Sequence, residues 1–135
     1  MANSSPAWVD TVQVAVVVNN EPVTPLPTTE AAAGAIGRYT GSDITYQELV
    51  SWAVATGKVG ELKEILILSD NYTKTAIQIT VAGTVFKTNW IMLSAMPLIF
   101  EDLHLAEGDE VLVEVESTDG TSIMVDGVIV GKEIG

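Results

Sequence analysis

The sequence contains no cysteine and a single histidine, His104. Without cysteine it has neither a disulfide framework nor thiolate chemistry, which fits synthesis in a reducing cytosol. A cupin-type metal site needs a cluster of histidine and carboxylate ligands, and a zinc site without cysteine generally needs more than one imidazole. Several acidic loops offer oxygen ligands for Ca²⁺, but none follows the EF-hand or repeat spacing. We therefore expect no metal site and no cofactor.

The sequence also lacks the residue patterns that are typical of catalysis. His104 could serve as a base for one of three serines: Ser94, Ser117 or Ser122. No nucleophile elbow surrounds any of these serines. Glu114 and Glu116 could form a carboxylate pair, but they alternate with valines that need burial and should therefore point to solvent. We expect that the protein is not an enzyme.

Basic residues are few, with six Lys and Arg against 18 Asp and Glu, a formal charge of −12 and a pI near 4.1. Six scattered cations cannot supply a phosphate-binding footprint, so we expect no nucleic-acid partner. An acidic exterior suits solubility or docking onto a basic partner surface. No apolar run reaches the roughly 20 residues of a membrane-spanning helix, and residues 1–6 lack the regions of a signal peptide. We expect no membrane partner and no export by that route.

Aromatic residues are also scarce, with three Trp, three Tyr and two Phe. This number limits the size of any platform for binding sugars. Tyr72 or Trp90 could stack on a pyranose ring if it lay on a loop, and packing against its own neighbours is the alternative for each. The two residues are the candidates for ligand stacking.

Apolar residues, by contrast, are abundant. They make up 47% of the chain and give a mean hydropathy of +0.34, which is high for a soluble protein. A large β core uses such residues, and so do the interfaces of obligate assemblies. The composition therefore indicates apolar surface that is covered within the fold or between subunits.

Residues 108–131 carry the clearest strand pattern. Val111, Val113 and Val115 alternate with more polar residues and should face a core. Asp119-Gly120 then supplies a turn, after which the alternation resumes. We predict a β-hairpin, in which Asp126-Gly127 either bends the return strand or begins a new one.

From Ile44 onward, turn signals recur every 8 to 12 residues and predict about seven or eight short strands. Trp52 is the expected core anchor. Residues 61–68 fit a strand better than a helix, residues 75–81 and 85–87 form a hairpin, and Pro97 divides residues 90–100 into two short strands. Residues 101–109 are expected to be an acidic loop. The predicted fold is an all-β antiparallel sandwich of the jelly-roll type, with an immunoglobulin-like sandwich as the second choice.

The N-terminal region, before Ile44, has a different pattern from the strands that follow it. Residues 8–18 alternate like a strand but end apolar on both faces, so they lie inside a sandwich or form an arm that pairs with a neighbouring subunit, and we favour the arm. Residues 19–29 form a proline-rich tether, residues 30–37 a short helical turn, and residues 38–43 a turn. We expect an extended N-terminal arm and tether over residues 1–40 and a jelly-roll domain over residues 41–135. The arm residues expected to bind a partner are Trp8, Val12, Val14, Val16, Val18, Pro22, Pro25 and Pro27.

Residues 46–86 and 97–134 resemble the small β-sandwich virion proteins of tailed bacteriophages, especially the head decoration, or cement, proteins. The likeness is carried by the strand with Trp52, the turns at residues 59–62 and 69–71, and the Gly108-Asp109 entry to a hairpin closed by Asp119-Gly120. It implies a homotrimer that binds the major capsid protein on the outer head and stabilises the shell. The arm would add strands to a neighbouring subunit or to the shell.

This resemblance places the protein at the capsid surface of a virion, after synthesis in the host cytoplasm. The alternative function is a carbohydrate- or receptor-binding β-sandwich module of a phage tail or of a secreted protein. That alternative requires exposed aromatic side chains on a sheet face or loop end.

Overall fold

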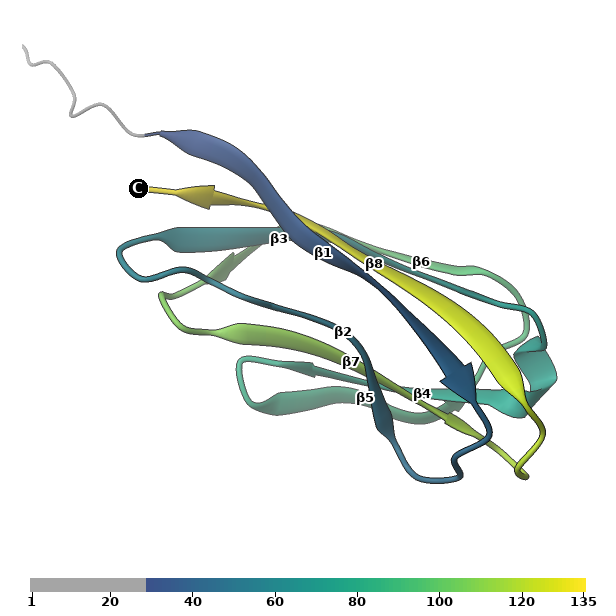
Figure 1. Ribbon diagram of the computed structural model, residues 1–135. Helices are drawn as coiled ribbons and strands as arrows, with labels where there is room; N and C mark the ends of the chain where they lie inside the picture. The colour runs from purple at the N-terminus through teal and green to yellow at the C-terminus, as the bar shows by residue number, and fades with distance from the viewer. Residues whose placement is uncertain (1–28) are drawn as a thin grey trace, which may run out of the picture.

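The computed structural model describes residues 29–135, which form two four-stranded antiparallel sheets packed face to face (Figure 1). The strands are β1 (Glu30–Gly41), β2 (Gln47–Ala53), β3 (Val59–Ser69), β4 (Thr75–Val81), β5 (Thr84–Ile91), β6 (Met96–Leu105), β7 (Glu110–Ser117) and β8 (Ile123–Ile134), with a single 3₁₀ turn, η1 (Tyr72–Lys74), before β4. The sheet orders are β1-β8-β3-β6 and β2-β7-β4-β5. Eight strands in this order are a jelly roll, so the predicted fold class is confirmed.

The hairpin predicted for residues 108–131 is wrong, because β7 and β8 belong to different sheets. β7 pairs with β2 and β4, whereas β8 pairs with β1 and β3. The valines of β7 do face the core, as their alternation predicts, and each is 0% exposed. A period of two residues shows which face of a strand is buried but not which strand lies beside it. The Asp119-Gly120 turn therefore carries the chain from one sheet to the other.

Hydrogen bonds fix this connection at its base. The hydroxyl of Ser117, 1% exposed, donates to the Thr121 carbonyl oxygen at 2.7 Å and accepts from the Gly120 N–H at 3.0 Å. The Asp119 carboxylate accepts from the Lys74 ammonium at 2.6 Å and from the Thr121 N–H and hydroxyl. The hydrogen bonds from Lys74 and Thr121 lower the pKa of Asp119 to about 2. The turn is thus tied both to itself and to η1.

Large side chains of β2 pack against glycines of the opposite sheet. The Trp52 side chain, 7% exposed, lies over Gly60 and Gly131, where an added Cβ would come within 3.3 Å and 2.8 Å of the indole. Its Nε1–H donates to the Glu133 carboxylate at 3.0 Å. A β-bulge between Glu48 and Val50 turns two successive residues, Leu49 and Val50, into the core. The prediction that Trp52 anchors the core is confirmed.

The helical turn predicted at residues 30–37 is wrong, because these residues belong to β1. β1 pairs with β8 without interruption from Glu30 opposite Ile134 to Gly41 opposite Ile123. The helix preference of its alanines is worth only tenths of a kcal/mol per residue, and Gly34 and Gly37 oppose a helix. The turn predicted at residues 38–43 therefore begins only after Gly41, and residues 30–41 are part of the sandwich. The arm proper, before residue 29, lies outside the described residues.

Other strand predictions divide into confirmed and corrected ones. Residues 61–68 are a strand, as predicted. The chain does divide within residues 90–100, but the break lies at residues 92–95, and Pro97 is inside β6 on its edge, opposite Leu66, so its predicted role as the breaking residue is wrong. The acidic loop predicted at residues 101–109 is mostly wrong, because β6 continues to Leu105. Leu103 and Leu105 lie opposite Leu62 and Gly60 of β3, and Leu105 is 4% exposed. Burial of these leucines keeps the acidic segment in the sheet.

The predicted β4–β5 hairpin is confirmed and has a two-residue loop, Ala82-Gly83, with φ values of 50° and 83°. Both residues have positive φ, as in the type I′ turn, which favours Asn-Gly. Alanine is strained at the first position. We expect Ala82→Asn to raise the free energy of unfolding by about 0.5–1 kcal/mol in urea titrations. At the second loop position, Gly83→Ala should lower the free energy of unfolding. A loss of stability in Ala82→Asn would contradict this turn geometry.

Candidate functional site

The outer face of the β1-β8-β3-β6 sheet carries an apolar row that crosses all four strands. Ile36 of β1 lies opposite Val128 of β8, which lies opposite Leu66 of β3, which lies opposite Pro97 of β6. The adjacent row adds Val130 of β8 and Ile99 of β6, which lie on either side of Glu64 of β3. We call the six apolar residues the apolar face.

The apolar face is exposed in the described part of the chain. Ile36, Ile99 and Val130 are 83%, 70% and 41% accessible to solvent. Antiparallel sheets that meet water on one side normally carry polar side chains there. The row from Ile36 to Pro97 is apolar on all four strands, while Glu64 interrupts the adjacent row. An exposed apolar patch of this kind is typical of a surface that a partner covers.

Charged groups lie along the two sides of the apolar face. On one side, the Arg38 guanidinium makes a bidentate contact with Asp126, at 2.6 Å and 3.2 Å, and this hydrogen bonding lowers the pKa of Asp126. On the other side, Lys132 lies 3.3 Å from Glu30 and 3.6 Å from Glu61. An apolar centre with a polar rim is the usual anatomy of a protein interface.

His104 belongs to this rim. Its side chain is 72% exposed and its Nδ1 lies 3.9 Å from a carboxylate oxygen of Glu61. Of the three serines considered as its partners, Ser117 uses its hydroxyl in the β7–β8 turn, and Ser94 donates to the carbonyl of Ala95. No described contact joins His104 to a serine.

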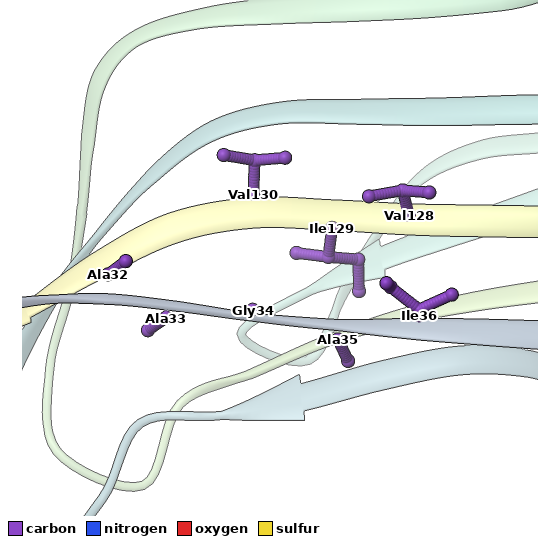
Figure 2. Close-up of a pocket in the computed structure, with 8 residues that line it drawn as sticks. All are labelled: Ala32, Ala33, Gly34, Ala35, Ile36, Val128, Ile129 and Val130. Carbon is purple, nitrogen blue, oxygen red and sulfur yellow. The ribbon is translucent and has the colours of Figure 1, made fainter.

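A groove of about 530 Å³ opens along β1 and β8 at the edge of the apolar face (Figure 2). Its lining is entirely apolar: Ala32, Ala33, Gly34, Ala35, Ile36, Val128, Ile129 and Val130. Three alanines and a glycine on β1 leave the space, while larger side chains on β8 and Ile36 form the sides. The groove can accept aliphatic side chains but offers no polar side chain to orient a small ligand.

The other sheet carries a row of polar side chains across its outer face, although Val85 and Ile91 of its edge strand β5 are 52% and 49% exposed. Glu48 lies opposite Glu114 across β2 and β7, and Gln78 of β4 donates to Glu114 at 2.9 Å. Thr88 of β5 donates to Gln78 at 2.7 Å, so the row of polar groups continues across the sheet. Glu114 and Glu116 point away from the core, as predicted. The centre of this sheet is therefore polar, whereas an apolar row crosses the centre of the other sheet.

The candidate stacking residues have contacts of their own. Tyr72 in η1 is partly buried and packs against the core. Trp90 lies in β5 opposite Ile77, also partly buried against the core, with the Lys87 ammonium 4.1 Å from the ring centroid. Neither side chain is exposed as a free ring, and stacking on a ligand stays a prediction.

The candidate arm residues, from Trp8 to Pro27, lie outside the described residues. The apolar face itself is missing from the sequence predictions. Its signal is the loss of alternation in β3 and β8, where Leu66, Val128 and Val130 are apolar on the face opposite the buried residues. The row becomes visible only when the register of the four strands is known.

Within residues 29–135, no group of three or more His, Asp or Glu side chains is placed to hold a metal ion. In the same range, none of the helical segments has the length and hydropathy needed to cross a membrane. Both findings concern only the part of the chain that the structure describes.

No family model matches this chain, and no curated protein matches its sequence. Among solved structures, one similar chain comes from the acid-stable capsid structure of Helicobacter pylori bacteriophage KHP30, with 11% identity, a TM-score of 0.48, and coverage of 78% of this chain and 93% of that one. Another is the CBM36-1 domain of a multidomain xylanase from the hindgut metagenome of Trinervitermes trinervoides, with 16% identity, a TM-score of 0.40, and coverage of 79% and 97%. Both likenesses are distant, and neither identifies a partner for this chain.

Proposed function

We propose that this protein is a non-enzymatic structural protein of a phage virion, a decoration protein that binds the major capsid protein on the outer head as an oligomer and stabilises the shell. In this role it needs no cofactor and contacts neither nucleic acid nor membrane. The observation that carries the proposal is the apolar face. It gives one side of the jelly roll a surface suited to burial against protein.

The difference between the two outer faces supports this assignment. The polar row of Glu48, Glu114, Gln78 and Thr88 suits contact with solvent, whereas Ile36 and Ile99 are mostly exposed without a polar role. A decoration protein must bind the shell on one side and face solvent on the other. The resemblance to head decoration proteins found in the sequence leads to the same role.

We expect Ile99→Asp to weaken binding to the shell by about tenfold or more, because the interface would bury a carboxylate without a partner. Binding is measured by co-sedimentation of the full-length protein with heads assembled from the major capsid protein of the same genome. Ile99 is 70% exposed but lies opposite Glu64, so the two facing carboxylates should lower the free energy of unfolding by no more than about 1 kcal/mol.

The matched control is Val85→Asp, which changes an apolar residue that is 52% exposed on β5 of the other sheet. It should bind as the unchanged protein does. Equal binding by both variants would remove the apolar face from the proposal. Failure of the unchanged protein to bind heads at all, or a monomer in light scattering after size-exclusion chromatography, would overturn the proposed function.

A further inference from the structure

We propose that the open edge of β1, together with the groove beside it, receives residues 8–18 of a second copy of this chain as an added strand. The inference deepens the proposed oligomeric function and rests on it. It names the segment that joins the subunits and the surface that binds this segment.

The first observation is that β1 is an edge strand without protection. In the described part of the chain it pairs with β8 alone, over all twelve of its residues and without a register shift. From Ala31 to Gly37 it contains neither a charged residue nor a proline. Gly34 in this stretch has a φ of +134°, but the pairing with β8 continues through it without a register shift. Long, uncharged edges are the ones that accept another strand.

The other three edges carry the devices that prevent such pairing. β6 contains Pro97, charged residues and a register shift against β3. β2 is seven residues long with a bulge after Glu48. β5 has two register shifts against β4, and its Asn89 has a φ of 53°. β1 is therefore the edge best suited to strand addition.

Only the first half of β1 is open. The second half lies close to β2, since a Cβ at Gly37 would be 2.1 Å from the Leu49 carbonyl oxygen. The groove lies along the first half, at residues 32–36, and Figure 2 shows its small β1 side chains beside the larger ones of β8. The open backbone edge and the apolar groove thus coincide.

Residues 8–18 have the chemistry that this surface requires. Their sequence, WVDTVQVAVVV, has the alternation of a strand and ends in branched apolar residues on both faces. A strand of this kind must be covered on both sides. The alanines and glycine of β1 leave room for its valines, while the backbone edge supplies hydrogen-bonding groups.

The chain between the two segments favours a second copy as the acceptor. Residues 19–29 include Pro22, Pro25 and Pro27, and in polyproline geometry these 11 residues span about 34 Å at about 3.1 Å per residue. A return to the same β1 would require these 11 residues to fold back on themselves, whereas their three prolines favour an extended course. An extended tether instead delivers residues 8–18 to a neighbouring subunit.

Disulfide trapping in the full chain tests this inference, because the natural sequence has no cysteine. One tagged copy carries Ala32→Cys, and a copy of different size carries a single cysteine at one position from 12 to 17. Directly opposed residues on neighbouring strands have Cβ atoms about 4.5–5.5 Å apart, close to disulfide geometry. We expect disulfides between copies at alternate arm positions only, because successive side chains of a strand point to opposite faces.

A cysteine at Thr84, on the edge strand of the other sheet, is the control acceptor and should trap no arm position. A further chain that carries both Ala32→Cys and an arm cysteine tests the return of the arm to its own β1. A disulfide within that chain in place of one between copies would overturn the inference. Trapping at every arm position alike, or at none, would also overturn it, since neither result is compatible with an ordered added strand.

A second variant separates this inference from the proposed function. Ala32→Glu places a carboxylate in the groove at an exposed position, and we expect it to weaken self-association by about tenfold or more with an unchanged unfolding midpoint. If the disulfides fail to form while binding to heads still depends on Ile99, the arm inference fails and the proposed function stands. If the disulfides form but the protein binds no heads, the arm inference stands and the proposed function fails.

Discussion

Replacing Gly34 with alanine should lower the free energy of unfolding by about 3 kcal/mol or more, although Gly34 lies at the surface. Its φ is +134°, a conformation that residues with a side chain rarely adopt. An added Cβ would also lie 2.0 Å from the Ile129 carbonyl oxygen and 2.9 Å from its carbonyl carbon. Both contacts are with backbone atoms, so no side-chain rotation relieves them. The pairing of β1 with β8 must open instead.

Two further variants divide this effect into its parts. Gly57 has a φ of +81° with open space around its Cβ position, so Gly57→Ala measures the conformational cost, about 1 kcal/mol. Gly37 lacks a positive φ but would place a Cβ 2.1 Å from the Leu49 carbonyl oxygen, so Gly37→Ala measures the steric cost.

Urea unfolding of the three variants, with hydrogen exchange of the β1 amides, checks the result. Gly34→Ala should be the least stable of the three and should expose the amides of β1. The expected cost already includes the gain of about 0.4–1 kcal/mol that alanine provides by restricting the unfolded chain. A cost no larger than that of Gly57→Ala would disprove the close contact between Gly34 and β8.

The second large effect is expected for Trp52→Ala, which should cost about 3–5 kcal/mol of unfolding free energy. The indole fills the space above Gly60 and Gly131, and these glycines have no side chains of their own to fill the cavity that its removal would leave. Its removal also takes a donor from the Glu133 carboxylate, which would keep only the Ala55 N–H at 3.2 Å. Cavity and lost hydrogen bond therefore act together.

Trp52→Phe separates these two contributions. It keeps an aromatic ring in the core but removes the Nε1–H donor, and we expect about half of the loss found for alanine. Trp90→Ala is the control for loss of an indole in general, because Trp90 is partly buried at the edge strand β5. Urea titrations followed by circular dichroism give all three values. If Trp90→Ala cost as much as Trp52→Ala, the anchoring role of Trp52 would be contradicted.

The local sequence predicts strands wherever the alternation is strong and the turns are marked. Val111, Val113 and Val115 are buried as their spacing indicates, and the loop Ala82-Gly83 forms the hairpin expected of it. The predictions are wrong where the local conformational preference of a segment is weak compared with the energy of its pairing with another strand. The alanines of β1 favour a helix in isolation, but pairing with β8 makes them a strand.

In the candidate site, too, some features follow from the local sequence and others depend on pairing between distant segments. The arm prediction follows from residues 8–18 alone and lies outside the described residues. The apolar face needs residues from four strands, and no local pattern specifies which of them become neighbours. Ile36, Leu66 and Val128 are separated by many residues in the chain, and only the register of β1, β8 and β3 places them in one row.

The sequence by itself determined the all-β class, the buried valines and Trp52, because alternation and turn chemistry act over a few residues. The tertiary structure decided that β7 and β8 lie in different sheets, that β1 is an open edge, and that one outer face is apolar. Each of these depends on pairing between distant segments. Such pairing is set by the packing of the whole chain, and the local alternation of residues does not record it.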